Sequence, residues 1–231
     1  MIITKLSSRK DIDFESGAVV LIDKIKGKTS FDAVYKVRKA IKVKKVGHAG
    51  TLDPEATGLL IICTGKKTKE INTFQDLGKT YTGTIKLGYV TKSFDTETEP
   101  VFCADCSNLE QVKIEEVRNS FLGKIKQYPP MFSAVKHNGK ALYKYARKGV
   151  EVERKERDIE ISKFDITVEL PLVHFKIQCS KGTYIRVLAS DVGEKLGCGG
   201  YLLDLRRTAI GEYSVDDAFT ITEFYDFMKT N

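Results

Sequence analysis

The segment at residues 47–58, with the sequence GHAGTLDPEATG, constrains this chain more than any other. Glycine reaches backbone angles that other residues avoid, and Pro54 fixes its own φ and restricts the residue before it. The segment therefore predicts a shaped loop that holds Asp53 and His48 in place. The apolar run at residues 59–63 follows at once and predicts a buried strand that anchors the loop. Turn chemistry alone leaves two interpretations open, a catalytic aspartate or an ordinary Asp-Pro turn.

Hydrophobic patterns predict an α+β fold without a regular βαβ alternation. Strands are expected at residues 19–22, 81–87, 157–168 and 172–180. Helices are expected at 114–121 before Gly123, at 184–196 before Gly197 and within 219–224. A further helix is capped by Thr29 or Ser30, with an inner face of Phe31, Val34, Val37 and Ile41. Several strands are neighbours in sequence, so we expect an antiparallel or mixed sheet with flanking helices.

Composition favours a globular protein with a polyanionic partner. The 231 residues are 42% hydrophobic and 30% charged, with no apolar run near the ~18 residues of a membrane span and no signal-peptide pattern. We therefore expect a cytoplasmic protein without membrane contact. The net charge of +7 is concentrated around the Asp53 loop. The flanking cations are Lys36, Arg38, Lys39, Lys42, Lys44 and Lys45 on one side and Lys66, Lys67 and Lys69 on the other. A solvated helix face explains the first group as well as phosphate binding does, but cations on both sides favour RNA.

The five cysteines predict reduced thiols and no metal. Cys103 and Cys106 have zinc-like spacing, but no second pair or His-x-x-x-His motif follows them. Three scattered histidines also make a catalytic metal unexpected.

Six blocks of sequence occur in a characteristic order along the chain. They are residues 21–24, 45–69, 79–81 with 87–88, 127–136, 142–149, and 179–186 leading to 205–208. In this order they resemble the TruB family of tRNA pseudouridine synthases, over nearly the whole chain. The resemblance implies a pseudouridine synthase fold, with a central curved sheet flanked by helices and a cleft across the sheet. It also implies one catalytic domain over residues 1–231, and here the C-terminal PUA domain of many relatives is expected to be absent.

The implied reaction turns the uridine of the tRNA T-arm loop into pseudouridine. A glycosidic C–N bond breaks, the base rotates and a C–C bond forms, so nothing is oxidised, no group is supplied and no cofactor is expected. An ionised aspartate is a competent nucleophile, and Asp53 matches the nucleophile of the family. A carboxylate in a dry pocket needs a nearby cation to stay charged, and Arg186 matches that partner. Tyr81 matches the aromatic residue that stacks on the target base.

Other residues match positions that bind the RNA substrate. His48 matches a residue that holds the flipped-out conformation, with a general-base role as the sharper alternative. Lys24 and Lys69 match positions near the site or the RNA backbone, and we expect contacts to phosphate or to site residues from them. Leu205 is expected to line the pocket, beside Arg206 and Arg207, which brace the fold or touch RNA. Tyr184 precedes Arg186 in the same block, and Glu55, which departs from the family pattern, is expected to face solvent.

Residues 124–152 interleave cations with aromatics. This pattern suits an RNA clamp, with cations on phosphates and rings on bases, and the resemblance implies a mobile insertion here. The alternative is a surface excursion whose aromatics pack on the core. We expect a tRNA partner, no obligate protein partner and a monomer.

Three other functions stay open at this point. The chain could be a non-catalytic RNA-folding protein with the same clamp. It could belong to the guide-dependent branch that modifies ribosomal RNA, although that branch relies on a PUA domain and protein partners. A hydrolase that uses Asp53 is the most distant, because no metal cluster or Ser-His pair accompanies it.

Overall fold

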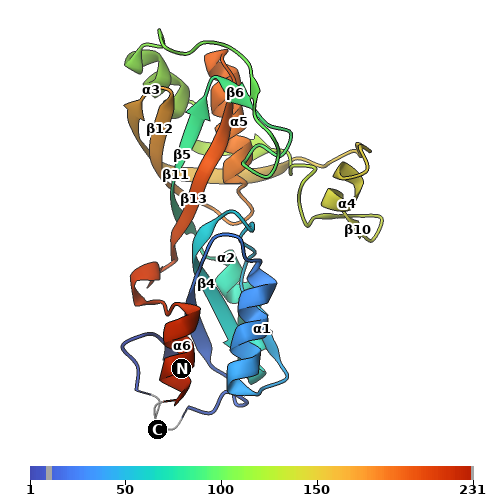
Figure 1. Cartoon of the computed structure of the whole chain (residues 1–231), viewed down its shortest axis with the longest axis vertical. Helices are drawn as coiled ribbons and strands as arrows, with labels where there is room; N and C mark the ends of the chain where they lie inside the picture. The colour runs from blue at the N-terminus through green and yellow to red at the C-terminus, as the bar shows by residue number, and fades with distance from the viewer. Residues whose placement is uncertain (9–11, 230–231) are drawn as a thin grey trace. The chain divides into compact units, whose positions relative to one another are not determined.

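A computed structural model describes residues 1–8 and 12–229, and the chain divides into two compact units (Figure 1). Unit 1 comprises residues 1–81 and 205–231, and unit 2 comprises residues 82–204. The main strands hydrogen-bond in the order β1-β2-β4-β13-β5-β12-β11-β8, with parallel and antiparallel neighbours. The predicted α+β class with a mixed sheet is therefore confirmed. A single catalytic domain and a cleft across the sheet stay predictions. No helix in the described ranges has both the length and the apolarity to cross a membrane.

Unit 1 is built on β2 and β4, which are buried on both faces. Its strands are β1 (Ile2–Ile3), β2 (Val19–Lys24), β3 (Val46–His48), β4 (Thr57–Thr64) and β14 (Tyr213–Ser214). Its helices are α1 (Ser30–Ile41), η1 (Gly65–Glu70), α2 (Ile71–Asp76), η2 (Val215–Asp217) and α6 (Ile221–Lys229). Strands β5 (Lys79–Leu87) and β13 (Gly200–Ile210) each contribute residues to both units.

Alternate residues of β2 and β4 enter two separate cores. Val20, Ile22, Leu60 and Ile62 pack in the cluster that includes residues of α1 and α6. Their neighbours Val19, Leu21, Leu59 and Ile61 pack in the cluster that includes Phe74 of α2. Burial on both faces explains why these strands are continuous apolar runs without alternating polar residues.

Helix α1 begins with a capping box. The Thr29 hydroxyl accepts a hydrogen bond from Asp32 N at 3.1 Å, and the Asp32 carboxylate accepts one from Thr29 N at 2.8 Å. The predicted cap is confirmed, but the predicted inner face was wrong for Phe31, which is 62% exposed. The buried stripe runs through Ser30, Ala33, Val34 and Val37, and Phe31 lies about 100° of helical rotation beyond Ser30.

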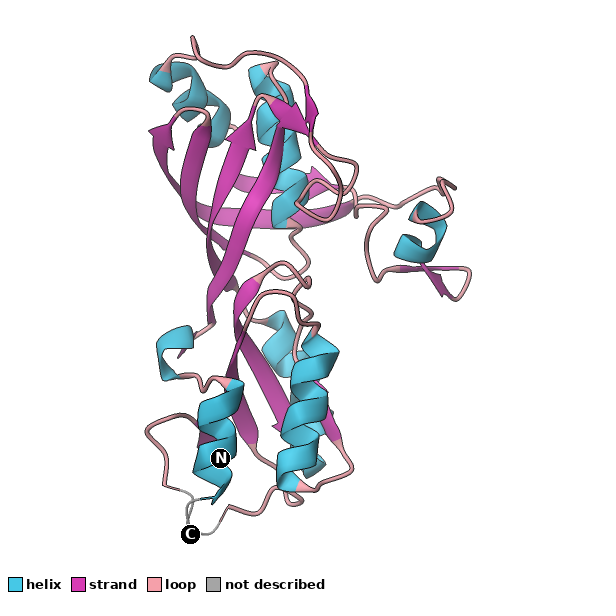
Figure 2. Cartoon of the chain, in the orientation of Figure 1, coloured by secondary structure: helices cyan, strands magenta, loops and turns pink. Residues whose placement is uncertain are grey.

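Unit 2 contains an antiparallel group of long strands with two helices beside it (Figure 2). Its strands are β6 (Tyr89–Val90), β7 (Val101–Phe102), β8 (Gly123–Gln127), β9 (Lys136–His137), β10 (Lys140–Ala141), β11 (Arg157–Glu169) and β12 (Leu172–Cys179). Its helices are α3 (Gln111–Asn119), α4 (Leu142–Ala146) and α5 (Ile185–Leu196). The predicted pairing across residues 169–171 and the stop of α5 at Gly197, with φ 78°, are confirmed. Helix α3 ends before Gly123, which instead opens β8.

The segment at residues 128–152 leaves the body of unit 2 as an excursion that carries the β9–β10 hairpin and α4 (Figure 1). Its cations lie over its own rings, with Lys140 Nζ 4.8 Å from the Tyr145 ring centre and Arg147 5.4 Å from that of Tyr143. Arg147 also forms an exposed ion pair with Glu97 at 3.2 Å.

Gly58 joins β4 to β13 at a point with no room for a side chain. Its φ is 106°, and a Cβ atom there would overlap the Arg207 backbone. We predict that Gly58→Ala lowers the free energy of unfolding by about 3 kcal/mol or more, because left-handed strain and overpacking add. Urea unfolding at neutral pH measures this change.

Gly27→Ala is the matched control. Gly27 also has a positive φ, 74°, but a Cβ there would meet no described atom within 4 Å. It should lose only about 1–2 kcal/mol from backbone strain. Equal losses in the two variants would contradict close packing of β4 on β13.

Candidate functional site

The Asp53 loop connects β3 to β4, which pair with each other through Val46–Thr64, Gly47–Cys63 and His48–Ile62. Ala49 N donates to Ile61 O at 2.9 Å at one end of the loop. Ala56 N donates to Asp53 O at 3.1 Å at the other end. The predicted strand at residues 59–63 thus anchors the loop within β4.

A buried lysine fastens the loop at Pro54. Lys24, at the end of β2, is 2% exposed, and its ammonium donates to Pro54 O at 3.3 Å, to Lys28 O at 2.7 Å and to Ile25 O at 3.1 Å. Three donors meet three carbonyls, which offsets much of the cost of burying the charge. Gly27 N donates to the same Pro54 carbonyl at 2.9 Å. The residue after Asp53 is therefore held from two sides.

The charge of Lys24 acts on Asp53. Burial lowers the pKa of Lys24 to about 8, the Asp53 carboxylate opposes this shift most strongly, and Glu55 adds to that opposition. At neutral pH the ammonium stays charged. Because the attraction is mutual, it also favours the ionised form of Asp53 that a nucleophile needs. The Glu55 side chain is 38% exposed, and its Oε2 atom forms an ion pair with Nζ of the exposed Lys26 at 3.3 Å.

A second buried cation holds the other part of the loop. Arg207, on β13, is 1% exposed, and its guanidinium donates to Leu59 O at 2.8 Å and to Gly50 O at 3.2 Å. Its neighbour Arg206 makes a two-pronged ion pair with Asp23 at 2.7 and 3.0 Å. These contacts brace the fold through both arginines, and contact of the 41% exposed Arg206 side chain with RNA stays a prediction.

The first residue of α1 holds the loop directly before Asp53. The buried Ser30 hydroxyl accepts a hydrogen bond from Leu52 N at 2.8 Å and lies 3.1 Å from Leu52 O, to which it donates. Helix α1 is therefore fixed to the loop at its start.

His48 lies at the end of β3, close to the same loop. Burial lowers its pKa, the nearby Arg207 charge lowers it further, and a backbone interaction with Gly50 opposes both. Its Nδ1 atom is buried and makes no hydrogen bond within the described part of the chain. The imidazole is therefore neutral at pH 7, a form that can either pack against a base or accept a proton, so both roles of His48 stay predictions.

The remaining predicted residues of unit 1 lie on three elements. Tyr81 is 8% exposed on β5. Leu205 is half-buried on β13, where its carbonyl accepts a hydrogen bond from the Thr57 hydroxyl at 3.5 Å. Lys69 is exposed on η1. Their contacts with substrate stay predictions, as does that of Lys24.

Arg186 belongs to unit 2, where a buried carboxylate and a carbonyl orient it. It is 4% exposed on α5, with Nη1 3.3 Å from Asp95 Oδ2 and Nη2 2.6 Å from Phe132 O. Gln127 clamps the backbone of Tyr184, donating to its carbonyl at 3.1 Å and accepting from its N–H at 2.8 Å. These contacts fix the start of α5. Asp53 belongs to unit 1, so the Asp53–Arg186 pair stays a prediction.

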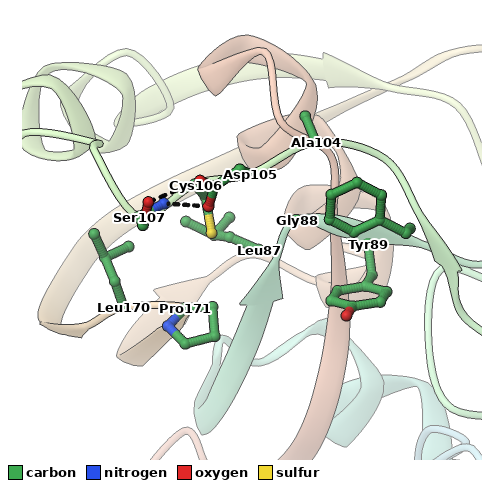
Figure 3. A pocket seen from close by; sticks show the side chains of 10 residues that line it. Leu87, Gly88, Tyr89, Ala104, Asp105, Cys106, Ser107, Leu170 and Pro171 are labelled. Atoms are coloured by element: carbon green, nitrogen blue, oxygen red, sulfur yellow. Dashed lines mark hydrogen bonds between the residues drawn. The ribbon is translucent and has the colours of Figure 1, made fainter.

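Unit 2 also contains a cavity of about 340 Å³ between the end of β5 and residues 104–107 (Figure 3). Leu87, Tyr89, Phe102, Leu170 and Pro171 supply most of its apolar lining. The Asp105 carboxylate there is engaged by Ser107 N and Oγ, both at 2.9 Å. None of the predicted site residues lines this cavity. Among the residues described, no group of three or more His, Cys, Asp or Glu side chains could hold a metal.

Comparison with known families covers most of the chain. Residues 38–185 match the model of the TruB family pseudouridylate synthase N-terminal domain, and residues 186–231 match a tRNA pseudouridylate synthase B C-terminal domain. The chain belongs to the TruB family. The predicted resemblance is thereby confirmed.

Individual relatives agree with this TruB assignment. The chain is 52% identical to tRNA pseudouridine synthase B of Chloroherpeton thalassium, over 91% of this chain and 90% of that protein. It is 46% identical to the protein of the same name from Bacillus subtilis, over 89% of this chain and 69% of the other. Among solved structures, the crystal structure of a Cbf5-Nop10-Gar1 complex matches with a TM-score of 0.71 and 26% identity, covering 95% of this chain and 60% of that one.

Sequence reasoning missed several residues that hold the predicted site residues within their own units. Ser30 was considered only as a cap, and no role was assigned to Asp95 or Gln127. Asp95 follows Phe94, which has a φ of 65°, and no local pattern predicts that this strained turn meets α5. Gln127 lies within one of the matched blocks. It is 2% exposed, and this burial, which would have pointed to a structural role, was not visible in the sequence.

The buried ammonium of Lys24 predicts a pH-dependent stability. Its pKa of about 8 lies below the ordinary lysine value of 10.5, so the unfolded chain binds more protons between these two pH values and stability rises with pH there. We expect wild type to gain about 2 kcal/mol over Lys24→Met between pH 7 and pH 9.5. Urea unfolding of both proteins at both pH values measures this difference. Groups other than Lys24 titrate equally in the two proteins, so their contribution cancels. A difference independent of pH would contradict a buried charge at this position.

Proposed function

We propose that this TruB-family chain is a tRNA pseudouridine synthase that makes pseudouridine-55 in the T-loop. Relatives named tRNA pseudouridine synthase B, about 50% identical over about 90% of the chain, support this function. The observation that carries it is the Asp53 loop, because buried Lys24 and Arg207 hold its backbone and leave the Asp53 carboxylate partly accessible. An isolated turn would not need two buried cations.

Asp53 is the nucleophile of the reaction. The detached base must be held while it rotates, and a carboxylate stabilises the electron-poor fragment when the glycosidic bond breaks. Lys24 favours the ionised form of Asp53. Asp53 starts the reaction and is regenerated when the C–C bond forms, so the chemistry needs no cofactor.

Arg186 is the positively charged partner that keeps the Asp53 carboxylate ionised. Guanidinium stays protonated and presents a planar fork, which suits a carboxylate partner in a dry site. Asp95 and the Phe132 carbonyl orient that fork within unit 2. Tyr81 stacks on the target base and stands near the ring proton that must leave.

The remaining predicted residues bind the RNA. A uridine in a folded loop must leave its stack at a cost of a few kcal/mol, and His48 packs in the space that it vacates. Leu205 and Tyr184 line the base pocket, and Lys69 contacts phosphate. The excursion at residues 128–152 exchanges its internal cation–π contacts for bases and phosphates of the T-arm. The protein acts as a cytoplasmic monomer, with loop shape as the main basis of recognition.

Asp53→Asn tests the nucleophile directly. The amide preserves size but has no negative charge, so we predict that pseudouridine formation falls by at least about 10³-fold while the affinity for RNA is kept. Chemical mapping of pseudouridine in an unmodified tRNA transcript measures turnover, and filter binding measures affinity.

Glu55→Gln is the control for this test. It removes a carboxylate two residues away that pairs with exposed Lys26, and it should keep the wild-type rate within about threefold. If Asp53→Asn retained more than a few percent of the rate, Asp53 would not be the nucleophile. Wild-type protein that leaves the transcript unmodified would instead support an RNA-folding protein.

A further inference from the structure

Helix α1 carries aromatic and basic side chains on one exposed stripe. We define the α1 stripe as Lys28, Phe31, Tyr35, Lys39 and Lys42. Phe31, Tyr35 and Lys39 are four residues apart within α1, which places them on one face of the helix. Lys28 precedes the Thr29 cap and Lys42 is the C-cap, so these two lysines flank the ends of the helix. Phe31 is 62% exposed and Tyr35 is 57% exposed, and the three lysines are also exposed.

The exposure of these rings follows from the packing of α1. The face formed by Ala33, Val34 and Val37 packs in the core of unit 1. Phe31 and Tyr35 stand beyond that face, where burying either ring against this unit would require rotating the helix. Large rings left in water on consecutive turns indicate a surface with a binding partner.

The charge on the α1 stripe is of one sign. The nearby Asp32 carboxylate is occupied at the helix start, where it accepts hydrogen bonds from Thr29 N at 2.8 Å and from the Thr29 hydroxyl at 2.7 Å. None of the three stripe lysines has an ion-pair partner in the described part of the chain. Alternating rings and cations match a polyanion with stacking bases, which is the chemistry of unpaired RNA.

The α1 stripe begins at the Asp53 loop. Ser30 holds Leu52 through two hydrogen bonds, so Phe31 lies one residue from the point where α1 joins the residue before Asp53. From there the helix extends 12 residues, or about 18 Å. RNA that presents a nucleotide to Asp53 can therefore continue along this face.

We propose that the α1 stripe is a second RNA-binding surface, which holds unpaired nucleotides flanking the target uridine. Phe31 and Tyr35 stack on bases, and Lys28, Lys39 and Lys42 bind the phosphates. This inference rests on the proposed function but concerns binding alone, so it is tested without turnover.

The test measures RNA binding in the Asp53→Asn background. Adding Phe31→Ala and Tyr35→Ala should weaken binding of an unmodified tRNA transcript at least about 30-fold, because each of the two stacked bases contributes about 1–3 kcal/mol. Adding Lys39→Gln and Lys42→Gln instead should reduce the slope of log affinity against log salt by about 1–2. Thermal unfolding verifies that each variant is folded.

Phe102→Ala is the matched control, because Phe102 is also 62% exposed but lies on β7 of unit 2. It should change the affinity less than twofold. Affinities unchanged by the Phe31 and Tyr35 substitutions would overturn the proposal. The proposal would also be overturned if those variants lost binding to polyglutamate but kept their affinity for RNA. That result would identify an acidic protein as the partner of this surface.

The two proposals fail separately. If wild-type protein forms no pseudouridine but the stripe variants still lose RNA affinity, the proposed function is wrong and the second surface stands. If wild-type protein is active and the stripe variants bind as well as the control, only the second surface is wrong.

Discussion

The ammonium of Lys24 is the constraint on which the Asp53 loop depends. A lysine that is 2% exposed must satisfy its three donors within the protein, and Lys24 does so on the carbonyls of Ile25, Lys28 and Pro54. Those carbonyls come from two segments of the chain, so one charge ties the turn after β2 to the residue after Asp53. Leaving any of these groups buried without a partner would cost about 1–3 kcal/mol.

Three elements converge on the loop through independent contacts. Strand β2 supplies Lys24, strand β13 supplies Arg207, and helix α1 supplies Ser30. Each element is itself fixed by a core that is packed on both faces of β2 and β4. The positions of loop atoms are thus inherited from rigid strands, which is how a loop residue gains the precision that catalysis needs.

Sequence reasoning predicted the elements better than the contacts among them. The apolar run at residues 59–63 and the period-two pattern of β5 follow from burial alone, so both could be predicted. Phe31 was misplaced because its spacing to Val34 suits either side of a helix, and the capping box that starts α1 at Ser30 decides the rotation. The roles of Ser30, Asp95 and Gln127 depend on partners between 22 and 91 residues away, which no local pattern reveals.

Lys24 is a second case in which the sequence did not reveal the contacts of a residue. The family resemblance indicated that it lies near the site and left two kinds of contact open, to phosphate or to residues of the site. The structure buries its charge under the loop, where it contacts Pro54 O and interacts with the Asp53 carboxylate, so the second kind of contact is present. Only the three-dimensional neighbourhood shows that this cation contacts backbone carbonyls around the Asp53 loop.

Hydrogen exchange of the loop amides tests this account most directly. Leu52 N donates to Ser30 Oγ at 2.8 Å and Ala56 N donates to Asp53 O at 3.1 Å, so both amides report on the loop and not on the strands. We predict that they exchange slowly in wild type and at least about tenfold faster in Lys24→Met, while amides within β4 keep their protection. Equal exchange of Leu52 and Ala56 in the two proteins would contradict the claim that a buried ammonium holds the Asp53 loop.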